Sequence, residues 1–452
     1  MSFLFSSNLI FWFGWVILPI IVEFIPSVGN FFLLIKKHIK LKSNLKEIYQ
    51  QPITIIVPIY NSAKTLYACL QSINNSNYDK NLIEVMCVDN GSKDNSFDIF
   101  QQAQMDFVDL AMYWMKSKQG KSKALNKAIF NSQGKYIINI DSDGILQTNA
   151  LYNMVRKFEL YPEFDCLTGA VLIEPRLIEE TPFGFLRFFR KIEFIEYCQA
   201  FLAGRNFQSE TNNIFTLSGA FSALRKSTLF KTFMYNTDTI CEDAHLTFQV
   251  KELLKQKVGL CENAVFMVDP IDNINKYYTQ RQRWQIGELE VLKMFVLKKM
   301  KNPFHIITDG ALRTVVLDHT LTFAKFIWIF ITLLFMFSNN MMKIVTLSLL
   351  LVYGLSVLSS FMYSLNVLQF LDFDTDLQDY YEDNMWYVLF IPIYNLFSYF
   401  VRFCGIVNSI ERKSSWKTKT FTEEMQDVKV DLLHDFNFVF KVTSLFRKVL
   451  EK

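Results

Sequence analysis

The chain has 452 residues, of which 16% are aromatic, and its formal net charge is +3. This length exceeds one ordinary domain, and the high aromatic content indicates that part of the chain lies in apolar surroundings. So small a net charge gives no reason to expect a nucleic-acid partner, and none is predicted. The cysteines are Cys69, Cys87, Cys166, Cys198, Cys241, Cys261 and Cys404. Because they form no CxxC pair, we expect reduced, buried side chains of a cytosolic domain and not a disulfide framework or a zinc site.

The first long apolar segment runs from Leu9 to Ile35 and contains Pro19 and Pro26. It is long enough to cross about 30 Å of hydrocarbon as a kinked helix. A basic cluster follows, and such clusters stay on the cytoplasmic side; it comprises Lys36, Lys37, His38, Lys40 and Lys42. A signal peptide is the alternative, but no small-residue cleavage site follows. Residues 1–42 are therefore predicted to be a transmembrane anchor in the lipid bilayer.

The region from Gln50 to about Met300 has the pattern of a soluble α/β domain. Ile53 to Ile59 is a β-branched run, followed by a polar turn and a helical stretch through Ile73. Glu84 to Val88 and Tyr136 to Ile140 repeat the strand pattern. Strand, turn and helix in succession predict a mostly parallel sheet with helices on both faces and ligand groups at the carboxyl ends of the strands.

Acidic turns follow two of these predicted strands. Asp89 comes directly after the second strand, where in isolation it is better explained as a helix cap. Asp141 and Asp143 follow the third strand, and a plain surface turn is one interpretation of them. Two carboxylates one residue apart at a strand end can also share Mg²⁺ or Mn²⁺, whose remaining ligands would be water and diphosphate oxygens.

A second apolar zone begins near Thr320. It contains candidate membrane spans at about Leu321 to Phe337, Ile344 to Val367 and Trp386 to Val407. Three spans would leave the C-terminus outside, although the tail is basic and is expected to stay inside; its cations are Arg412, Lys413, Lys417 and Lys419. One of the three segments is therefore expected to be re-entrant or interfacial. We divide this part into an interfacial region at 301–319, membrane helices at 320–410 and an interfacial or cytosolic tail at 411–452.

An ordered set of six motifs resembles the family 2 glycosyltransferases. Within that family the chain is similar to the processive branch, which includes cellulose, hyaluronan, chitin and poly-N-acetylglucosamine synthases. The resemblance covers roughly Gln50 to Met300 and implies a GT-A-like domain inserted between N-terminal and C-terminal transmembrane helices. QxxRW is the most specific motif of the set, which consists of Ile56-Val57-Pro58-Ile59-Tyr60-Asn61, Val88-Asp89-Asn90-Gly91-Ser92, Lys121-Ser122-Lys123-Ala124-Leu125-Asn126, Asp141-Ser142-Asp143, Glu242-Asp243 and Gln280-Arg281-Gln282-Arg283-Trp284.

The resemblance implies a binding site for a UDP-sugar donor. Asp89 would accept the uracil imide hydrogen, Tyr60 would line the base, and Lys121, in a polar loop after a glycine, would reach the diphosphate. Asp141 would face the nucleotide, and Asp143 would hold Mg²⁺ or Mn²⁺. The expected donor-binding residues are Pro58, Tyr60, Asn61, Asp89, Lys121, Asn126 and Asp141.

The resemblance also implies the catalytic and acceptor-side residues. Asp243 would be the general base with Glu242 as its partner, although Cys241 stands where the family usually has threonine. A surface helix cap is the simpler interpretation of Asp243. The expected acceptor or diphosphate contacts are Gly219, Gln280, Arg283 and Trp284, for which a glycine turn and an amphipathic helix on the membrane are the alternatives.

These features predict a multi-pass cell-membrane enzyme with a cytoplasmic catalytic domain. It would transfer sugars from a UDP-sugar, with inversion and metal dependence, to a nascent extracellular or capsular polysaccharide, in a processive reaction coupled to export. The alternatives are addition of one sugar to a membrane lipid carrier and a catalytically silent scaffold. The sugar, the linkage and any accessory export or regulatory subunits stay open.

Overall fold

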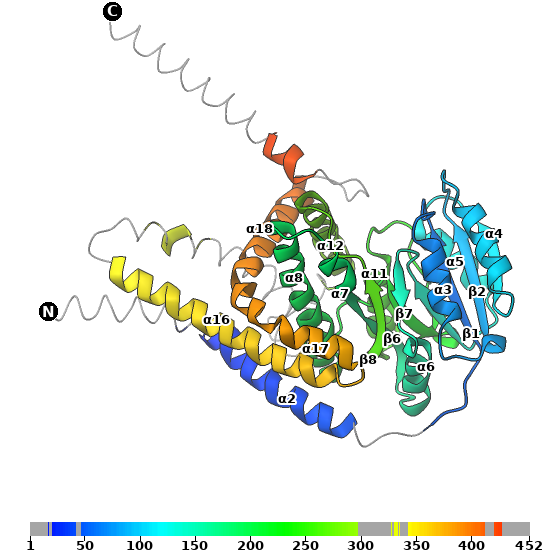
Figure 1. Cartoon of the computed structure of the whole chain (residues 1–452), viewed down its shortest axis with the longest axis horizontal. Helices are drawn as coiled ribbons and strands as arrows, with labels where there is room; N and C mark the ends of the chain where they lie inside the picture. Colours follow the sequence, from blue (N-terminus) through cyan, green and yellow to red (C-terminus); the bar gives the residue numbers. More distant parts are fainter. Residues whose placement is uncertain are drawn as a thin grey trace, which may run out of the picture.

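The computed structural model describes residues 17, 20–41, 47–296, 327, 330–332, 334, 342–411 and 420–426. An α/β body built on one sheet lies beside a group of long helices that come from both ends of the chain (Figure 1). Several predicted features lie outside the described residues. They are the interfacial region at 301–319, most of the span Leu321 to Phe337, the start of the N-terminal span and the basic residues 412–419 of the tail.

The body is organised by an eight-stranded mixed sheet with the order β3-β2-β1-β4-β7-β6-β8-β5. β1 pairs in parallel with β2 and β4, and β2 with β3, whereas β7 is antiparallel to β4 and β6, and β5 is antiparallel to β8. β6 also pairs in parallel with β8, so the predicted mostly parallel sheet is confirmed, with β7 and β5 as its antiparallel strands. The strands are β1 (Ile53–Ile59), β2 (Ile83–Asp89), β3 (Ala111–Lys116), β4 (Tyr136–Ile140), β5 (Gly144–Leu146), β6 (Phe164–Ile173), β7 (Phe221–Arg225) and β8 (Lys257–Val268).

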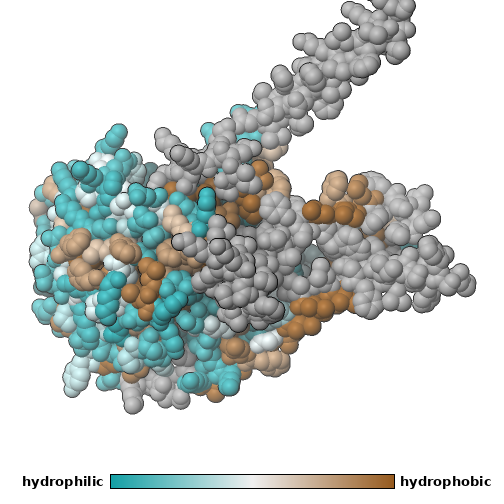
Figure 2. Space-filling view, turned by 180° about the vertical axis from the view of Figure 1, so that it is seen from behind, coloured by the Kyte–Doolittle hydropathy of each residue, from teal (hydrophilic) through white to brown (hydrophobic). Residues whose placement is uncertain are grey.

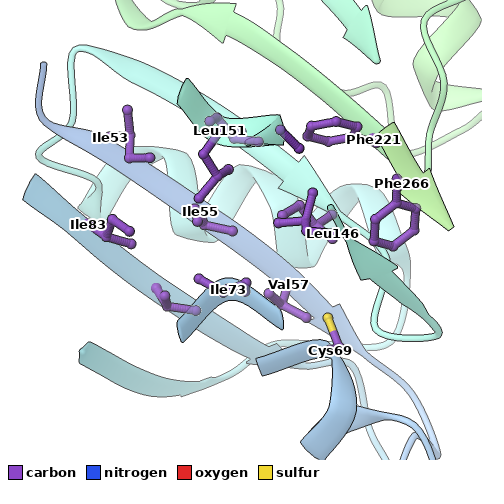
Figure 3. Close-up of a cluster of buried hydrophobic side chains, with 14 of the residues drawn as sticks. Ile53, Ile55, Val57, Cys69, Ile73, Ile83, Leu146, Leu151, Phe221 and Phe266 are labelled. Carbon is purple, nitrogen blue, oxygen red and sulfur yellow. The ribbon is translucent and has the colours of Figure 1, made fainter. Parts of the chain in front are cut away.

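Helices cover both faces of the sheet, as predicted. Alternate residues of a strand point to opposite faces, so Ile55 packs against α3 and α6 while Ile56 packs against α5. Figure 3 shows the first of these layers, with Ile53, Ile55 and Val57 lying beside residues of α3 and α6. The helices of the body are α3 (Leu66–Asn74), α4 (Ser96–Asp106), α5 (Lys121–Asn131), α6 (Ala150–Leu160), α7 (Pro175–Glu179), α8 (Phe185–Cys198), α9 (Arg205–Glu210), α10 (Lys226–Leu229), α11 (Glu242–Phe248) and α12 (Ile274–Phe295), with single turns or short π segments at η3 (Lys80–Leu82), η4 (Gln199–Gly204) and η5 (Gln249–Leu253).

The second group of helices consists of η2 (Ile20–Phe24), α2 (Ile25–Leu41), α16 (Met342–Phe370), α17 (Thr375–Asp383), η8 (Met385–Phe390) and α18 (Ile391–Glu411). Within the described residues, two segments are long and apolar enough to cross a membrane, Val345–Phe370 and Met385–Asn408. They coincide with the second and third predicted spans. Figure 2 shows a largely hydrophilic surface over the α/β body and hydrophobic side chains gathered toward the helical part.

The two groups share one buried core. Leu34 of α2, Phe194 of α8, Tyr277 of α12 and Val367 of α16 belong to the same hydrophobic cluster. α12 and α18 approach closely, because a Cβ atom added to Gly405 would lie 3.3 Å from Cβ and Cγ of Gln285. The helical part is therefore packed against the sheet domain through side chains and is not tethered to it only by loops.

A buried charge network also joins α2 to the body. Lys37 Nζ lies 2.9 Å from Glu210 Oε1, and Lys157 Nζ lies 2.6 Å from Glu262 Oε2. Lys157 and Glu262 are both close enough to Lys37 for their charges to act on it. Lys37, which the sequence assigns to a basic cluster at the membrane boundary, is thus 7% exposed and bound to the protein.

Candidate active site

The carboxyl ends of β1 and β2 carry two polar turns that are bonded to each other. Ile59 and Asp89 are register partners at the ends of these parallel strands. The backbone N–H of Asn61 donates to Ser92 Oγ at 3.0 Å, and Asn61 Oδ1 accepts from the backbone N–H of Lys93 at 2.8 Å. Asn61 has φ 52°, a left-handed conformation that asparagine tolerates better than most residues. Asn61 therefore holds the two turns together.

Asp89 also shapes its own turn. Its Oδ1 accepts from the backbone N–H groups of Gly91 at 3.1 Å and Ser92 at 2.8 Å. These bonds do not cap the next helix, because α4 begins only at Ser96. The simpler interpretation of Asp89 as a helix cap is therefore wrong, and the bonds to the turn fix the direction of the carboxylate at the strand end.

The remaining expected donor-site residues differ in accessibility. The Tyr60 side chain is 49% exposed, whereas Pro58 is buried within β1. The Asn126 side chain donates to the backbone carbonyl of Tyr235 at 2.8 Å and accepts from its N–H at 3.0 Å. Tyr60 is thus accessible at the strand ends. Pro58 packs inside the fold, and Asn126 connects α5 to the backbone at Tyr235.

Lys121 lies between several acceptors. The sequence assigns it to a polar loop, but it is the first residue of α5. Its Nζ lies 2.6 Å from Asp141 Oδ1, 3.2 Å from the Gly219 carbonyl and 3.8 Å from Glu242 Oε1. Burial opposes the charge on Lys121, but Asp141 and Glu242 outweigh it and hold the pKa of Lys121 above its ordinary value.

The acidic turn after β4 is held on both sides. The backbone N–H of Asp141 donates to the Ala220 carbonyl at 3.0 Å, and Ser142 Oγ lies 2.7 Å from Ser62 Oγ. Part of Asp143 is exposed, yet the protein removes enough water from its carboxylate to raise the pKa to about 6, with the charge of Asp141 adding to the effect. Asp141 is thus neutralised by Lys121, while Asp143 stays next to it as a second carboxylate.

This donor set fits a divalent cation held by one protein carboxylate. Among the residues that the structure describes, no group of three or more His, Cys, Asp or Glu side chains could hold a metal ion. Mg²⁺ and Mn²⁺ prefer oxygen ligands, and Mg²⁺ commonly binds one or two carboxylates together with substrate phosphates and water. Asp143 offers such a carboxylate, because its neighbour Asp141 is already paired with Lys121.

The Glu242–Asp243 pair begins α11, opposite this turn. A Cβ atom added to Gly219 would lie 2.9 Å from Asp243 Oδ2 and 3.6 Å from Lys121 Nζ. Asp243 Oδ1 accepts from the backbone N–H of Ala244 at 2.8 Å and from Cys241 Sγ at 3.3 Å. Glu242 is 5% exposed, and burial raises its pKa against the opposing effect of Lys121. The structure therefore brings Lys121, Asp141, Gly219, Glu242 and Asp243 together.

The QxxRW segment lies in α12. Arg283 is exposed and Trp284 is 37% exposed. Arg281 lies in the same motif, between Gln280 and Arg283. Its two terminal nitrogens donate to the Glu196 carboxylate at 2.7 and 3.3 Å, and its guanidinium lies 4.9 Å from the Trp284 ring centroid. One face of the indole is therefore covered by Arg281, and a sugar ring would have to stack on another part of it.

Part of the chain matches a known protein family. A family model described as glycosyl transferase family 2 matches residues 54–231. The chain contains a family 2 glycosyltransferase domain.

Relatives with assigned names extend the match beyond that domain. The glycosyltransferase is 24% identical over 333 residues to a poly-β-1,6-N-acetyl-D-glucosamine synthase of Staphylococcus aureus strain COL, covering 70% of this chain and 73% of the relative. It is 27% identical over 286 residues to the synthase of the same name from Staphylococcus epidermidis, covering 61% of this chain and 64% of the relative.

A solved structure supports the fold. The mannosyltransferase PcManGT from Pyrobaculum calidifontis, in complex with GDP-Man and Mn²⁺, superposes with a TM-score of 0.52 at 17% identity, over 76% of this chain and 94% of that one. The glycosyltransferase therefore has the expected GT-A-like α/β fold.

Some residues of the site had no signal in the sequence of the glycosyltransferase. Ser62 and Ser142 join two strand-end turns that are far apart in the chain. Ser62 stands in the polar turn after the first strand and Ser142 inside the Asp141-Ser142-Asp143 motif, but nothing local indicates that the two serines contact each other. Arg281 lies inside the QxxRW motif, so the sequence drew attention to its position, whereas its partner Glu196 belongs to no motif. Glu290 of α12, which accepts a hydrogen bond from Thr239, also lacked any signal.

Proposed function

We propose that this glycosyltransferase moves sugars from a UDP-sugar onto a growing polysaccharide in a single inverting displacement, with Asp243 as the general base. The observation that carries the proposal is the convergence of Asp243, Gly219 and Lys121, with Lys121 in turn bound to Asp141. This arrangement sets a carboxylate that can accept a proton next to a cation that can bind diphosphate. The names of the relatives favour a polymer as product.

The donor half of the site consists of the strand-end turns. Asp89 is held by its own turn, so its remaining carboxylate oxygen can accept the uracil imide hydrogen, while the accessible Tyr60 lines the base. Lys121 supplies a positive charge that is already in place before the diphosphate arrives. Such preorganised charge stabilises a transition state in which negative charge grows on the leaving group.

The chemical step requires a base on the acceptor side. As the acceptor oxygen bonds to the anomeric carbon, the bond from that carbon to the diphosphate oxygen breaks, UDP leaves with the bonding electrons, and Asp243 takes the hydroxyl proton. Attack from the side opposite the leaving group inverts the anomeric configuration. Glu242 precedes Asp243 in the chain and is buried beside Lys121. It is therefore the partner residue of the proposed base.

The metal is assigned to Asp143. A bound Mg²⁺ or Mn²⁺ supplies positive charge to the departing diphosphate. Asp143 would hold the ion directly. Asp141 would face the nucleotide instead, because its carboxylate is already paired with Lys121. This division matches the roles that the family resemblance implies for the two carboxylates.

The acceptor is assigned to the side of Gly219 and α12. Gln280, Arg283 and Trp284 would contact the nascent chain or the diphosphate, since an exposed indole can stack on a sugar ring and a guanidinium can bind phosphate. Together with the two candidate spans, this supports a multi-pass membrane enzyme with a cytoplasmic active site and processive synthesis coupled to export. Addition of a single sugar to a lipid carrier is the alternative.

Membranes containing the protein, incubated with individual labelled UDP-sugars and Mg²⁺ or Mn²⁺, test the proposal. UDP-N-acetylglucosamine is the first donor to try, because the relatives are named as synthases of its polymer. We expect high-molecular-mass product on a gel and none with Asp243→Asn. A lipid carrying one sugar would replace the proposal with its alternative, and no transfer from any UDP-sugar would refute both.

A further inference from the structure

The loop that leads into α11 is held by a glutamate of α12. Glu290 Oε2 accepts a hydrogen bond from Thr239 Oγ1 at 3.0 Å and another from the backbone N–H of Ile240 at 3.4 Å. Thr239 Oγ1 in turn accepts from the backbone N–H of Cys241 at 3.2 Å. Thr239 is 5% exposed, so these bonds lie mostly away from water, where a lost partner is costly.

A second contact joins the same loop to α12 one turn earlier. A Cβ atom added to Gly287 would lie 2.5 Å from Cβ and 3.0 Å from Sγ of Cys241. No side chain fits at such a distance without displacing the loop. Gly287 and Glu290, three residues apart, face the same side of the helix, so α12 contacts the loop at two points.

The loop ends at the proposed base. Cys241 Sγ donates to Asp243 Oδ1 at 3.3 Å, and the backbone N–H of Ala244 donates to the same oxygen at 2.8 Å. These two bonds orient the carboxylate so that Oδ2 is directed toward Gly219. The thiol is a weak donor, so it cannot hold the carboxylate by itself unless the loop places Sγ correctly.

We infer that Glu290 and Gly287 are positioning residues for Asp243, since α12 holds the loop Thr239 to Cys241 so that Asp243 Oδ2 faces the acceptor side. The inference rests on the proposed role of Asp243 as the base. It links the helix that carries Gln280 to Trp284 with the proton acceptor. A misplacement of about 1 Å can cost about a hundredfold in rate, so two contacts far from the reacting atoms can control the rate.

The test compares paired variants of the full-length protein. Glu290→Ala and Thr239→Val remove the bonds, while Glu290→Gln and Thr239→Ser keep an oxygen at each position. Gly287→Ala pushes on Cys241, and Gly354→Ala is its matched control, because a Cβ atom at that helical glycine meets nothing within 4 Å. Lys293→Ala changes an exposed residue of α12.

Two readouts separate positioning from general damage. The first is kcat and KM with UDP-N-acetylglucosamine, or with the donor that the screen of UDP-sugars identifies. The second is the rate at which Cys241, which is partly buried, is alkylated by N-ethylmaleimide, followed by peptide mass spectrometry in the presence of UDP. The second does not depend on activity. A melting curve for each variant confirms folding.

We expect Glu290→Ala, Thr239→Val and Gly287→Ala to lower kcat by about tenfold to a hundredfold, with KM and UDP affinity within twofold. Cys241 alkylation should become several times faster in the first two. Glu290→Gln and Thr239→Ser should recover most of kcat, and both controls should match the native protein.

Three results would overturn the inference. They are an unchanged kcat in Glu290→Ala and Thr239→Val, a higher KM at constant kcat, and a lower kcat without faster alkylation of Cys241. The proposed function fails in a different experiment, because it requires Asp243→Asn to be inactive whatever the α12 variants do.

Discussion

The ammonium of Lys121 lies 2.6 Å from Asp141 Oδ1 and 3.8 Å from Glu242 Oε1. One cation therefore connects the acidic turn after β4 with α11, whose first turn contains the proposed base Asp243. Since Glu242 is 5% exposed, the charge of Lys121 is also what makes burial of this carboxylate tolerable. Lys121 is thus expected to serve both the proposed donor site and the stability of the domain.

Replacing Lys121 should affect binding and stability together. Lys121→Met removes the charge that we propose binds the diphosphate, and it leaves Glu242 buried without its cation. We therefore expect UDP affinity to fall at least tenfold and the melting temperature to drop. Calorimetric titration with UDP and differential scanning fluorimetry measure the two effects. Lys123→Met, at an exposed position two residues later, is the matched control. Equal behaviour of the two variants would contradict this role of Lys121.

Asp243→Asn should separate chemistry from binding. The amide keeps the shape and an oxygen for Cys241 and Ala244 but cannot take the acceptor proton. General bases typically contribute about a hundredfold to ten-thousandfold in rate, so transfer should fall by at least a hundredfold while UDP affinity changes little. Near-native polymer synthesis by this variant would make Glu242 or another group the base.

Asp89→Asn should have the opposite effect. The amide oxygen can still accept from Gly91 and Ser92, so the turn should persist. A donor NH₂ would replace an acceptor at the uracil imide, and an unpaired buried polar group costs about 1–3 kcal/mol. UDP titration should therefore show clearly weaker binding, with kcat at saturating donor largely retained. Unaltered UDP affinity would remove Asp89 from the donor site.

Metal removal tests Asp143. Excess EDTA should abolish both donor hydrolysis and transfer, and Mg²⁺ or Mn²⁺ added in excess of the chelator should restore them, because the charge on the departing diphosphate needs a cation. Circular dichroism should show that the protein stays folded. Asp143→Ala should resemble the chelated protein and should not respond to added metal. Full activity in excess EDTA would exclude the metal from the reaction.

Glu193 of α8 should make stability depend on pH. Burial raises its pKa to about 7, although Arg281 opposes the shift. A carboxyl whose pKa is higher in the folded state stabilises the fold below its unfolded pKa, and this contribution is lost as the pH rises through about 7. Glu193→Gln keeps an acceptor for the backbone N–H of Ile271. Its melting temperature relative to the native protein should therefore rise from pH 5 to pH 8.5, and a difference independent of pH would contradict the shift.

The sequence predicted the strands better than the contacts between elements. Ile53–Ile59 and Tyr136–Ile140 are strands with the predicted limits, because strands buried on both faces appear as uninterrupted apolar runs. Lys121 was assigned to a loop, since its polar neighbours conceal the start of α5. The antiparallel pairing of β7 with β4 and β6 also had no local signal.

The same reason explains which site residues could be predicted. Asp89 ends β2, Asp141 follows β4, and Asp243 lies in the first turn of α11. All three belong to motifs whose order in the chain is distinctive. Glu290 contacts Thr239, 51 positions away in the chain, and no periodic pattern connects two such residues. Contacts of this kind become visible only when α12 is placed against the loop before α11.

The contact of Gly405 with Gln285 has a practical consequence for producing the protein. α18 covers a side of α12 that includes Tyr277 and Gln285, both buried. Expressing residues 50–300 alone would expose that side to water, together with the apolar surface of α8 that faces the same helices. Such a fragment should aggregate or require detergent, so a crystallisable, active form of this enzyme will have to retain its C-terminal helices.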